Sequence, residues 1–188
     1  MKIFTYEFDY EIPQELIGVY IKESGDSPHD LKVFDKPLEW SPPIVEFDAK
    51  LDRIDAIPAT NLPLHVASKE LAGAIKEIAK EDIVLIPFEV KTKGKVSTDF
   101  YVLHPVKRVA IWDMEASKWD PATMPKWPKD RPLHMHDMVL MQKGIEPFSI
   151  AYNKNWNSML VFNQEIADLL TKHSKWLKII TPDHYSTA

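Results

Sequence analysis

The stretch that decides the fold runs from residue 64 to residue 90 and reads LHVASKELAGAIKEIAKEDIVLIPFEV. The apolar LHVA at 64–67 predicts a short buried strand, and Ser68 is a residue type that often caps the N-terminus of a helix. The following segment repeats apolar residues at helical spacing, which places five of them on one face: Leu71, Ala72, Ile75, Ile78 and Ala79. The β-branched run at 83–90 then predicts a second strand. The stretch therefore predicts a strand–helix–strand unit.

A second unit with the same order of elements lies near the C-terminus. SMLVF at 158–162 predicts a strand, Asn163 an N-cap, and QEIADLLTKH a helix, before WLKIITP returns as a strand. One face of this helix would carry Ile166, Leu169, Leu170 and His173. At one constant offset in numbering the two units share five identities: Val66 with Val161, Glu70 with Glu165, Ala72 with Ala167, Lys80 with Lys175, and Pro87 with Pro182. Duplication and chance similarity of two such units both remain open.

Outside the two units the sequence mostly predicts short strands and turns. IFTYEFDY alternates, with Phe4, Tyr6, Phe8 and Tyr10 on one side, and LIGVYIK at 16–22 predicts another strand. Residues 23–43 are rich in turn formers, and 44–54 fit either a strand or a short helix. After the first unit, TKGK predicts a turn, and FYVLH and RVAIWD predict strands separated at Pro105.

These elements predict one α+β domain over residues 1–188, with a mixed or mostly antiparallel sheet and helices packed on it. Its expected segments are 1–60 with N-terminal strands and turns, 61–111 with the first unit, 112–136 as a loop, and 137–188 with the second unit. Whether 1–60 share the main core stays open.

Residues 112–136 hold three Trp and four Pro without a strand or helix period, which predicts a long surface loop. Tryptophan is favoured at protein–protein hot spots because its large ring is buried at little entropic cost. We therefore expect a partner to bind this loop at Trp119 and Trp127, with Trp112 and Asp113 beside them. The alternative is that these rings, with Trp156, pack onto the protein's own core.

The motif HMHD supplies the candidate metal ligands His134, His136 and Asp137. On an extended strand the two histidines share one side and Asp137 points to the other, so another ligand must come from elsewhere. The remaining candidates are His29, His65 and His104, and no spacing places any of them nearby. The expectation is that the chain binds no metal and no cofactor.

Other catalytic motifs are not visible. The five glycines are scattered, so none forms a phosphate-binding loop, and no serine lies in a G-x-S-x-G elbow. Acidic pairs such as Glu7/Asp9 and Asp52/Asp55 fit solvated faces. The chain is therefore not expected to be an enzyme.

Composition narrows the class of partner and the compartment. A net charge of −5 argues against a nucleic-acid-binding protein, and the strongest apolar run, IVLIPF at 83–88, is too short to span a membrane. There are no cysteines, and the N-terminus lacks the apolar core of a signal peptide. We expect a cytoplasmic protein without a membrane or nucleic-acid partner.

The order of VASKELAGAI, IVLIPFEV, DFYVLHPVKRVAIWDMEAS, PFSIAY and LVFNQEIADLL, followed by a strand ending in Pro182, resembles a known family. It is similar to bacterial polymorphic-toxin immunity proteins of the eleventh class, formerly a domain of unknown function. The resemblance covers about residues 60–185 and includes a strand ending in an aspartate, here Asp113, followed by a serine, here Ser117. Asn163 departs from the family, which more often has serine there, although both residue types cap helices.

The resemblance implies a cytoplasmic immunity protein that binds and neutralises a cognate antibacterial toxin, encoded next to it. Two alternatives stay open. One is a metal-assisted hydrolase using His134 and His136, and the other is a non-catalytic adaptor of a secretion or phage-type assembly. The identity of the toxin, the face that binds it and the oligomeric state are not fixed by the sequence.

Overall fold

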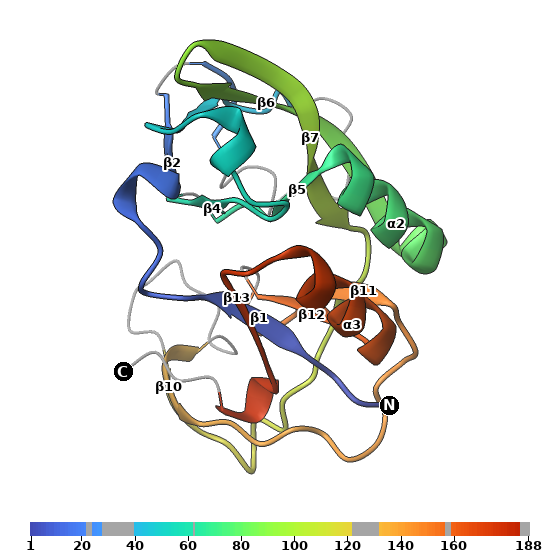
Figure 1. Ribbon diagram of the computed structural model, residues 1–188. Coiled ribbons are helices and arrows are strands. Elements are labelled where there is room, and N and C mark those ends of the chain that lie inside the picture. Colours follow the sequence, from blue (N-terminus) through green and yellow to red (C-terminus); the bar gives the residue numbers. More distant parts are fainter. Residues whose placement is uncertain (22–23, 28–39, 62, 122–131, 157–158, 185–188) are drawn as a thin grey trace.

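The computed structural model describes residues 1–21, 24–27, 40–61, 63–121, 132–156 and 159–184. In this part of the chain, strands and two α-helices form two units, one above the other in Figure 1. Within the described residues the upper unit has one sheet and one α-helix, and the lower unit has three smaller sheets and one α-helix. The α+β class with mixed sheets is thereby confirmed.

The upper unit contains a six-stranded sheet that curls into a half-barrel (Figure 1). Its strands, in spatial order, are β4 (Ala59–Thr60), β2 (Ile17–Tyr20), β3 (Val45–Glu46), β6 (Ile83–Thr92), β7 (Lys95–Pro105) and β5 (Val66–Ser68). β2 runs parallel to β4 and β3 parallel to β6, whereas the other neighbours are antiparallel. The predicted turn between β6 and β7 contains Gly94 at φ +82°, a conformation that favours glycine.

The lower unit is assembled from both ends of the chain. A three-stranded sheet comprises β8 (Arg108–Val109), β11 (Ile150–Asn153) and β12 (Leu160–Phe162). Beside it, β1 (Thr5–Phe8) pairs with β13 (Leu177–Ile180). Two backbone hydrogen bonds of 2.9 Å between Phe4 and Phe162 join these sheets. β1 therefore lies between β12 and β13.

Each α-helix connects two strands that are separated by a third. α2 (Lys69–Ala79) links β5 to β6, and both strands are antiparallel to β7. α3 (Gln164–His173) links β12 to β13, and both are antiparallel to β1. The two units thus share a split strand–helix–strand arrangement. The middle strand follows the helix in the upper unit but comes from the N-terminus in the lower one.

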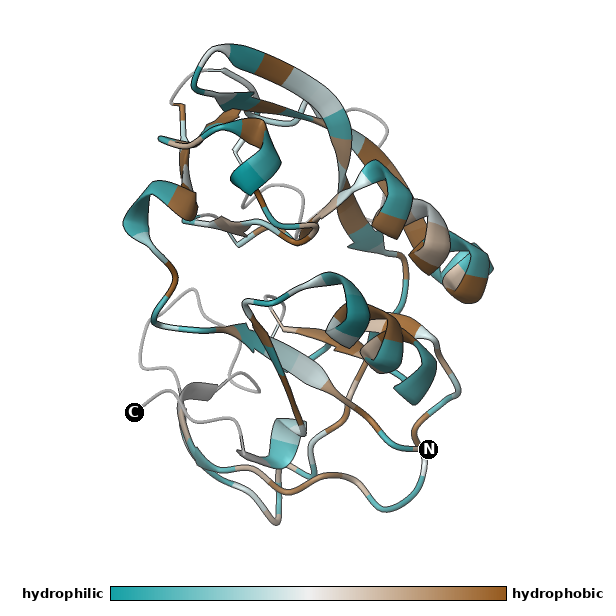
Figure 2. Cartoon of the chain, viewed as in Figure 1, coloured by the Kyte–Doolittle hydropathy of each residue, from teal (hydrophilic) through white to brown (hydrophobic). Residues whose placement is uncertain are grey.

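Hydrophobic packing joins the two units. Figure 2 shows hydrophobic and hydrophilic residues alternating along both α-helices, as expected for helices with one buried face. The shared core cluster combines Leu71, Ile75 and Leu103 of the upper unit with Phe162, Ile166 and Leu170 of the lower unit. A second cluster lies within the upper unit around Phe88, and a third within the lower unit around Trp112. Residues 1–60 contribute to both sheets.

Hydrogen bonds to two carboxylates, one buried and one half-buried, also join the two units. Asp82 follows α2 in the short 3₁₀ turn Lys80–Asp82; it accepts a hydrogen bond of 2.8 Å from the Ser149 amide and pairs with Lys107 at 2.8 Å. Asp55 follows the 3₁₀ turn Leu51–Arg53 and accepts a hydrogen bond of 2.9 Å from the Ser174 hydroxyl after α3. Further 3₁₀ turns are Gln14–Leu16 and Pro182–His184.

Some local expectations were wrong. β1 ends at Phe8, and Tyr10 is 87% exposed instead of sharing the buried side of a strand. Thr5 is buried because β1 is a central strand, and its hydroxyl donates to the Leu160 carbonyl at 2.7 Å. His173 is exposed in the last turn of α3. The ambiguous segment 44–54 divides into β3 and a 3₁₀ turn.

Candidate functional site

The described parts of the segment 112–136 contain strands that the sequence did not suggest, and residues 122–131 of the predicted loop lie outside the described residues. Its two ends form β9 (Lys118–Pro121) and β10 (Pro132–Asp137), an antiparallel pair in which Trp119 lies opposite Met135. The prediction of a loop without strands was therefore wrong. The strands escaped sequence analysis because their register shifts twice, which breaks the alternation that identifies a strand.

The candidate metal ligands make separate surface contacts. His136 Nε2 lies 3.0 Å from Asp120 Oδ2, and Asp137 Oδ2 lies 3.6 Å from Lys118 Nζ. The backbone of His134 faces Asp120, but its side chain lies outside the described part. Among the described residues, no group of three or more His, Cys, Asp or Glu is arranged to hold a metal ion.

The other described histidines considered as ligands contact residues outside the hairpin. His65 Nδ1 is 2.6 Å from the Tyr6 hydroxyl, and His104 is buried against the ring of Tyr152. His29 lies outside the described residues. Within the described residues, neither His65 nor His104 therefore joins His136 and Asp137 in a ligand set.

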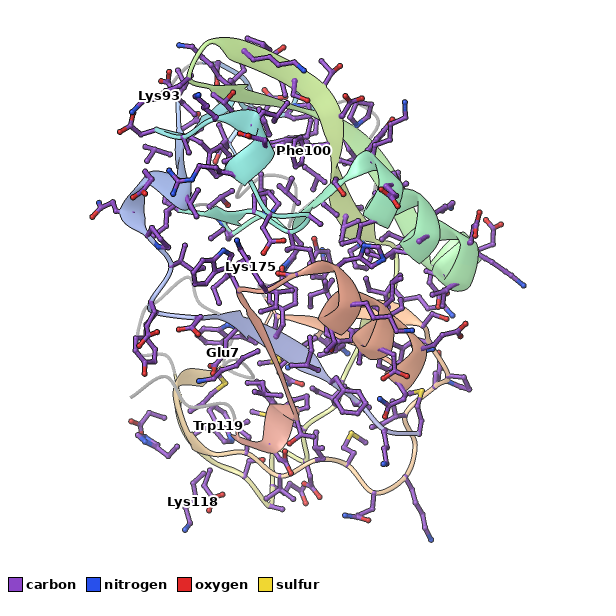
Figure 3. All side chains as sticks on the ribbon, in the orientation of Figure 1. Glu7, Lys93, Phe100, Lys118, Trp119 and Lys175 are labelled. Atoms are coloured by element: carbon purple, nitrogen blue, oxygen red, sulfur yellow. The ribbon has the colours of Figure 1, made fainter. Side chains whose placement is uncertain are left out.

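Trp119 is the sequence-predicted binding residue with the most suitable setting. Its ring is half-buried against the core of the lower unit, and Nε1 donates to the Met114 carbonyl at 3.0 Å. Figure 3 shows Trp119 and the neighbouring Lys118 at the lower left of the molecule. The exposed Lys118–Asp137 and Asp120–His136 pairs belong to the same two strands as Trp119. We refer to Lys118, Trp119, Asp120, His136 and Asp137 as the hairpin face.

Trp112 does not belong to this surface. It is 2% exposed, and its Nε1 donates to the Pro182 carbonyl at 3.2 Å. The expectation that Trp112 is an exposed anchor was wrong because β8 and the following residues run into the core of the lower unit. Trp156 is half-buried against the same core, whereas Trp127 lies outside the described residues.

Asp113 and Ser117 form the turn that leads into β9. Asp113 Oδ1 accepts hydrogen bonds of 3.1 Å from the amides of Glu115 and Ala116. The Ser117 hydroxyl donates to the Asp113 carbonyl at 2.6 Å and accepts from the Val139 amide at 2.9 Å. These bonds give both residues a positioning role, and the Asp113 carboxylate remains exposed.

A pocket of about 460 Å³ adjoins this turn. Its lining comprises Trp112, Asp113, Met114, Glu115, Met141, Gln142 and Lys143. We call it the methionine pocket. Sequence analysis missed it because its two walls, 112–115 and 141–143, meet only through tertiary pairing.

Sequence analysis also missed a buried group of polar rings where the two units meet. Tyr6 bonds to His65, and both His65 and His104 pack against Tyr152 at ring distances of 6.0 and 5.8 Å. Burial raises the pKa of Tyr6 and of Tyr152 above the ordinary value. Burial, with a smaller contribution from the cation of Arg108, lowers the pKa of His104 from 6.5 to about 4. At neutral pH Tyr6, Tyr152 and His104 are therefore uncharged.

A larger pocket of about 780 Å³ lies on the upper unit, between β2, β3 and the β6–β7 turn. Four of its charged lining residues pair with each other, Glu46 with Lys91 at 2.9 Å and Asp48 with Lys93 at 2.7 Å. Glu15, which also lines the pocket, pairs with Arg53 at 3.0 Å. This pairing gives no direct indication of the charge of a ligand.

Comparisons with known proteins gave no relative on which to base an assignment: no family model matches the chain, and no curated protein matches it. No helix in the described ranges is both long and apolar enough to cross a membrane.

Proposed function

We propose that this protein is a cytoplasmic immunity protein that binds a cognate antibacterial toxin and neutralises it through the hairpin face. The observation that carries the proposal is Trp119, a half-buried aromatic ring held by its indole hydrogen bond on a pair of strands that also carries exposed charged groups. The resemblance of residues 60–185 to immunity proteins supplies the class of partner.

The setting of Trp119 suits an anchor residue at an interface. A ring that is already fixed loses little conformational freedom on binding, so more of its contact energy contributes to affinity. Interface hot spots are also commonly surrounded by polar groups that exclude water once the partner has bound. The hairpin face supplies exposed polar groups of this kind in the Lys118–Asp137 and Asp120–His136 pairs.

The support beneath the hairpin suits a rigid inhibitor. Met135 on β10 is fully buried, opposite Trp119, and belongs to the core cluster of the lower unit. Because the hairpin is packed on this core, the exposed part of Trp119 is presented by an ordered scaffold. Binding then blocks the active site of the toxin or holds it in an inactive conformation.

Co-expression tests the proposal directly. The product of the gene next to this one is induced in a neutral bacterial host, with and without this protein. We expect growth to stop with the neighbouring product alone and to recover when both are present. Failure of the soluble protein to restore growth would contradict an immunity function.

The role of the hairpin face is tested by Trp119→Ala, with Tyr10→Ala as a matched control. Tyr10 is an aromatic residue that is 87% exposed and lies outside the hairpin. Loss of a hot-spot Trp typically costs at least about 2 kcal/mol of binding free energy, or roughly 30-fold in Kd. We expect this loss for Trp119→Ala alone, measured by calorimetry with the purified neighbouring product.

A further inference from the structure

The methionine pocket is an open depression beside the turn that leads into β9. Met114 and Met141 are both half-buried and line it from opposite segments, above the buried ring of Trp112. Methionine side chains are flexible and polarisable, and they adapt to the shape of an apolar group. At about 460 Å³ the pocket has room for a large side chain.

The backbone under the pocket is held in place. Asp113 donates from its amide to the Val139 carbonyl at 2.8 Å, and the Met141 amide donates to the Ile111 carbonyl at 2.9 Å. The Trp119 indole donates to the carbonyl of Met114, so the pocket wall and the hairpin face are directly connected.

The rim of the pocket carries more negative than positive charge. Asp113 and Glu115 are exposed, and neither forms an ion pair with another residue in the described part of the chain. Asp113 accepts both hydrogen bonds of the turn through Oδ1. Lys143 is the single basic residue of the lining. A cation beside the two carboxylates would complement this rim.

From these observations we propose that the methionine pocket receives an apolar side chain of the partner protein, with a neighbouring Lys or Arg of the partner placed against Asp113 and Glu115. The inference rests on the proposed immunity function and specifies the chemistry of the toxin segment that is bound. Trp119 and the pocket then form one continuous interface. The apolar side chain contributes mainly to the lifetime of the complex, and the charge pair mainly to the rate of association.

Two variants test the two halves of this inference. Met141→Gln keeps the length of the side chain but makes it polar, and we expect about 10-fold weaker binding of the purified neighbouring product, mostly from faster dissociation. Glu115→Lys reverses one rim charge, and we expect about 10-fold slower association at low salt, with a smaller effect at high salt. Glu77→Lys, an exposed charge reversal on α2, is the matched control and should leave both rates unchanged.

The outcomes separate this inference from the proposed function. If the wild-type protein restores growth but both variants bind as tightly as wild type, the pocket assignment is overturned and the immunity function stands. If the wild-type protein neither binds nor protects, both fall. A Met141→Gln change that alters the sedimentation of the protein alone would instead identify the pocket as a contact between two copies and overturn the inference. Glu115→Lys keeps the test decisive if Met141→Gln is poorly folded.

Discussion

In both units a helix connects two strands that pair with the same middle strand. The two middle strands, β7 and β1, come from different places in the sequence. In the upper unit β7 follows β6 after a short turn, so the pairing is local in sequence. In the lower unit β1 comes from the opposite end of the chain and pairs with β13. Closing such a distant contact costs chain entropy before packing offsets it. The unit that carries the candidate site therefore depends on both chain ends.

Removing a large core side chain should reveal how strongly the two units depend on each other. Phe162 is fully buried in the shared core cluster, and Phe88 is 2% exposed in the cluster of the upper unit. Each change to Ala should cost about 3–5 kcal/mol of unfolding free energy. Because only Phe162 touches the shared cluster, Phe162→Ala should lower amide-exchange protection in both units.

Phe88→Ala is the comparison in that experiment. We expect its effect on amide exchange to be larger in β6 and β7 than in β12 and α3. Equal loss of protection throughout the chain for both variants would show that the two units form one cooperative structure without a weaker boundary.

Lowering the pH should reduce the free energy of unfolding through His104, which lies where the two units meet. His104 has a pKa lowered from 6.5 to about 4, so the unfolded chain binds its proton at a higher pH than the folded protein does. The contribution of His104 to the free energy of unfolding is fully present above about pH 6.5. It declines as the pH falls toward 4 and changes little at lower pH. The full difference corresponds to about 3 kcal/mol.

His104→Phe isolates that contribution. The variant keeps a ring beside Tyr152 but cannot bind the proton, so its unfolding free energy should fall less between pH 7 and pH 4. His136→Gln on the exposed hairpin face serves as the control, measured by urea denaturation at each pH. An identical pH dependence of wild type and His104→Phe would contradict this assignment.

Backbone packing provides a third comparison, between a crowded and an open glycine. A Cβ on Gly18 would meet the side chains of Val45 and Phe47, whereas a Cβ on Gly73 in α2 would meet nothing within 4 Å. Gly18→Ala should therefore destabilise the upper unit by about 1–3 kcal/mol. Gly73→Ala should stabilise the protein by up to about 1 kcal/mol, because alanine favours the helix. Thermal unfolding of the two variants should show shifts of opposite sign.

The difference between the units also explains what the sequence could predict. The strand–helix–strand order and the turn at Gly94 follow from residues that are neighbours in sequence, and they appear in the structure as expected. The position of β1 and the Tyr6–His65 bond depend on residues far apart, for which no local pattern exists. At the candidate site, the aromatic content identified Trp119 as a residue of interest, but only tertiary structure separates it from the buried Trp112.

The helix caps give the smallest and most direct comparison of the two units. Asn163 Oδ1 accepts a hydrogen bond of 3.1 Å from the Ile166 amide, whereas Ser68 occupies the corresponding position before α2 without a side-chain capping bond. Asn163→Ala should therefore cost about 1 kcal/mol, and Ser68→Ala only a few tenths of that. Urea denaturation of the two variants measures this difference. Equal losses would mean that Ser68 adopts the capping rotamer in solution, which would make the two helix starts equivalent and strengthen the case for a duplicated unit.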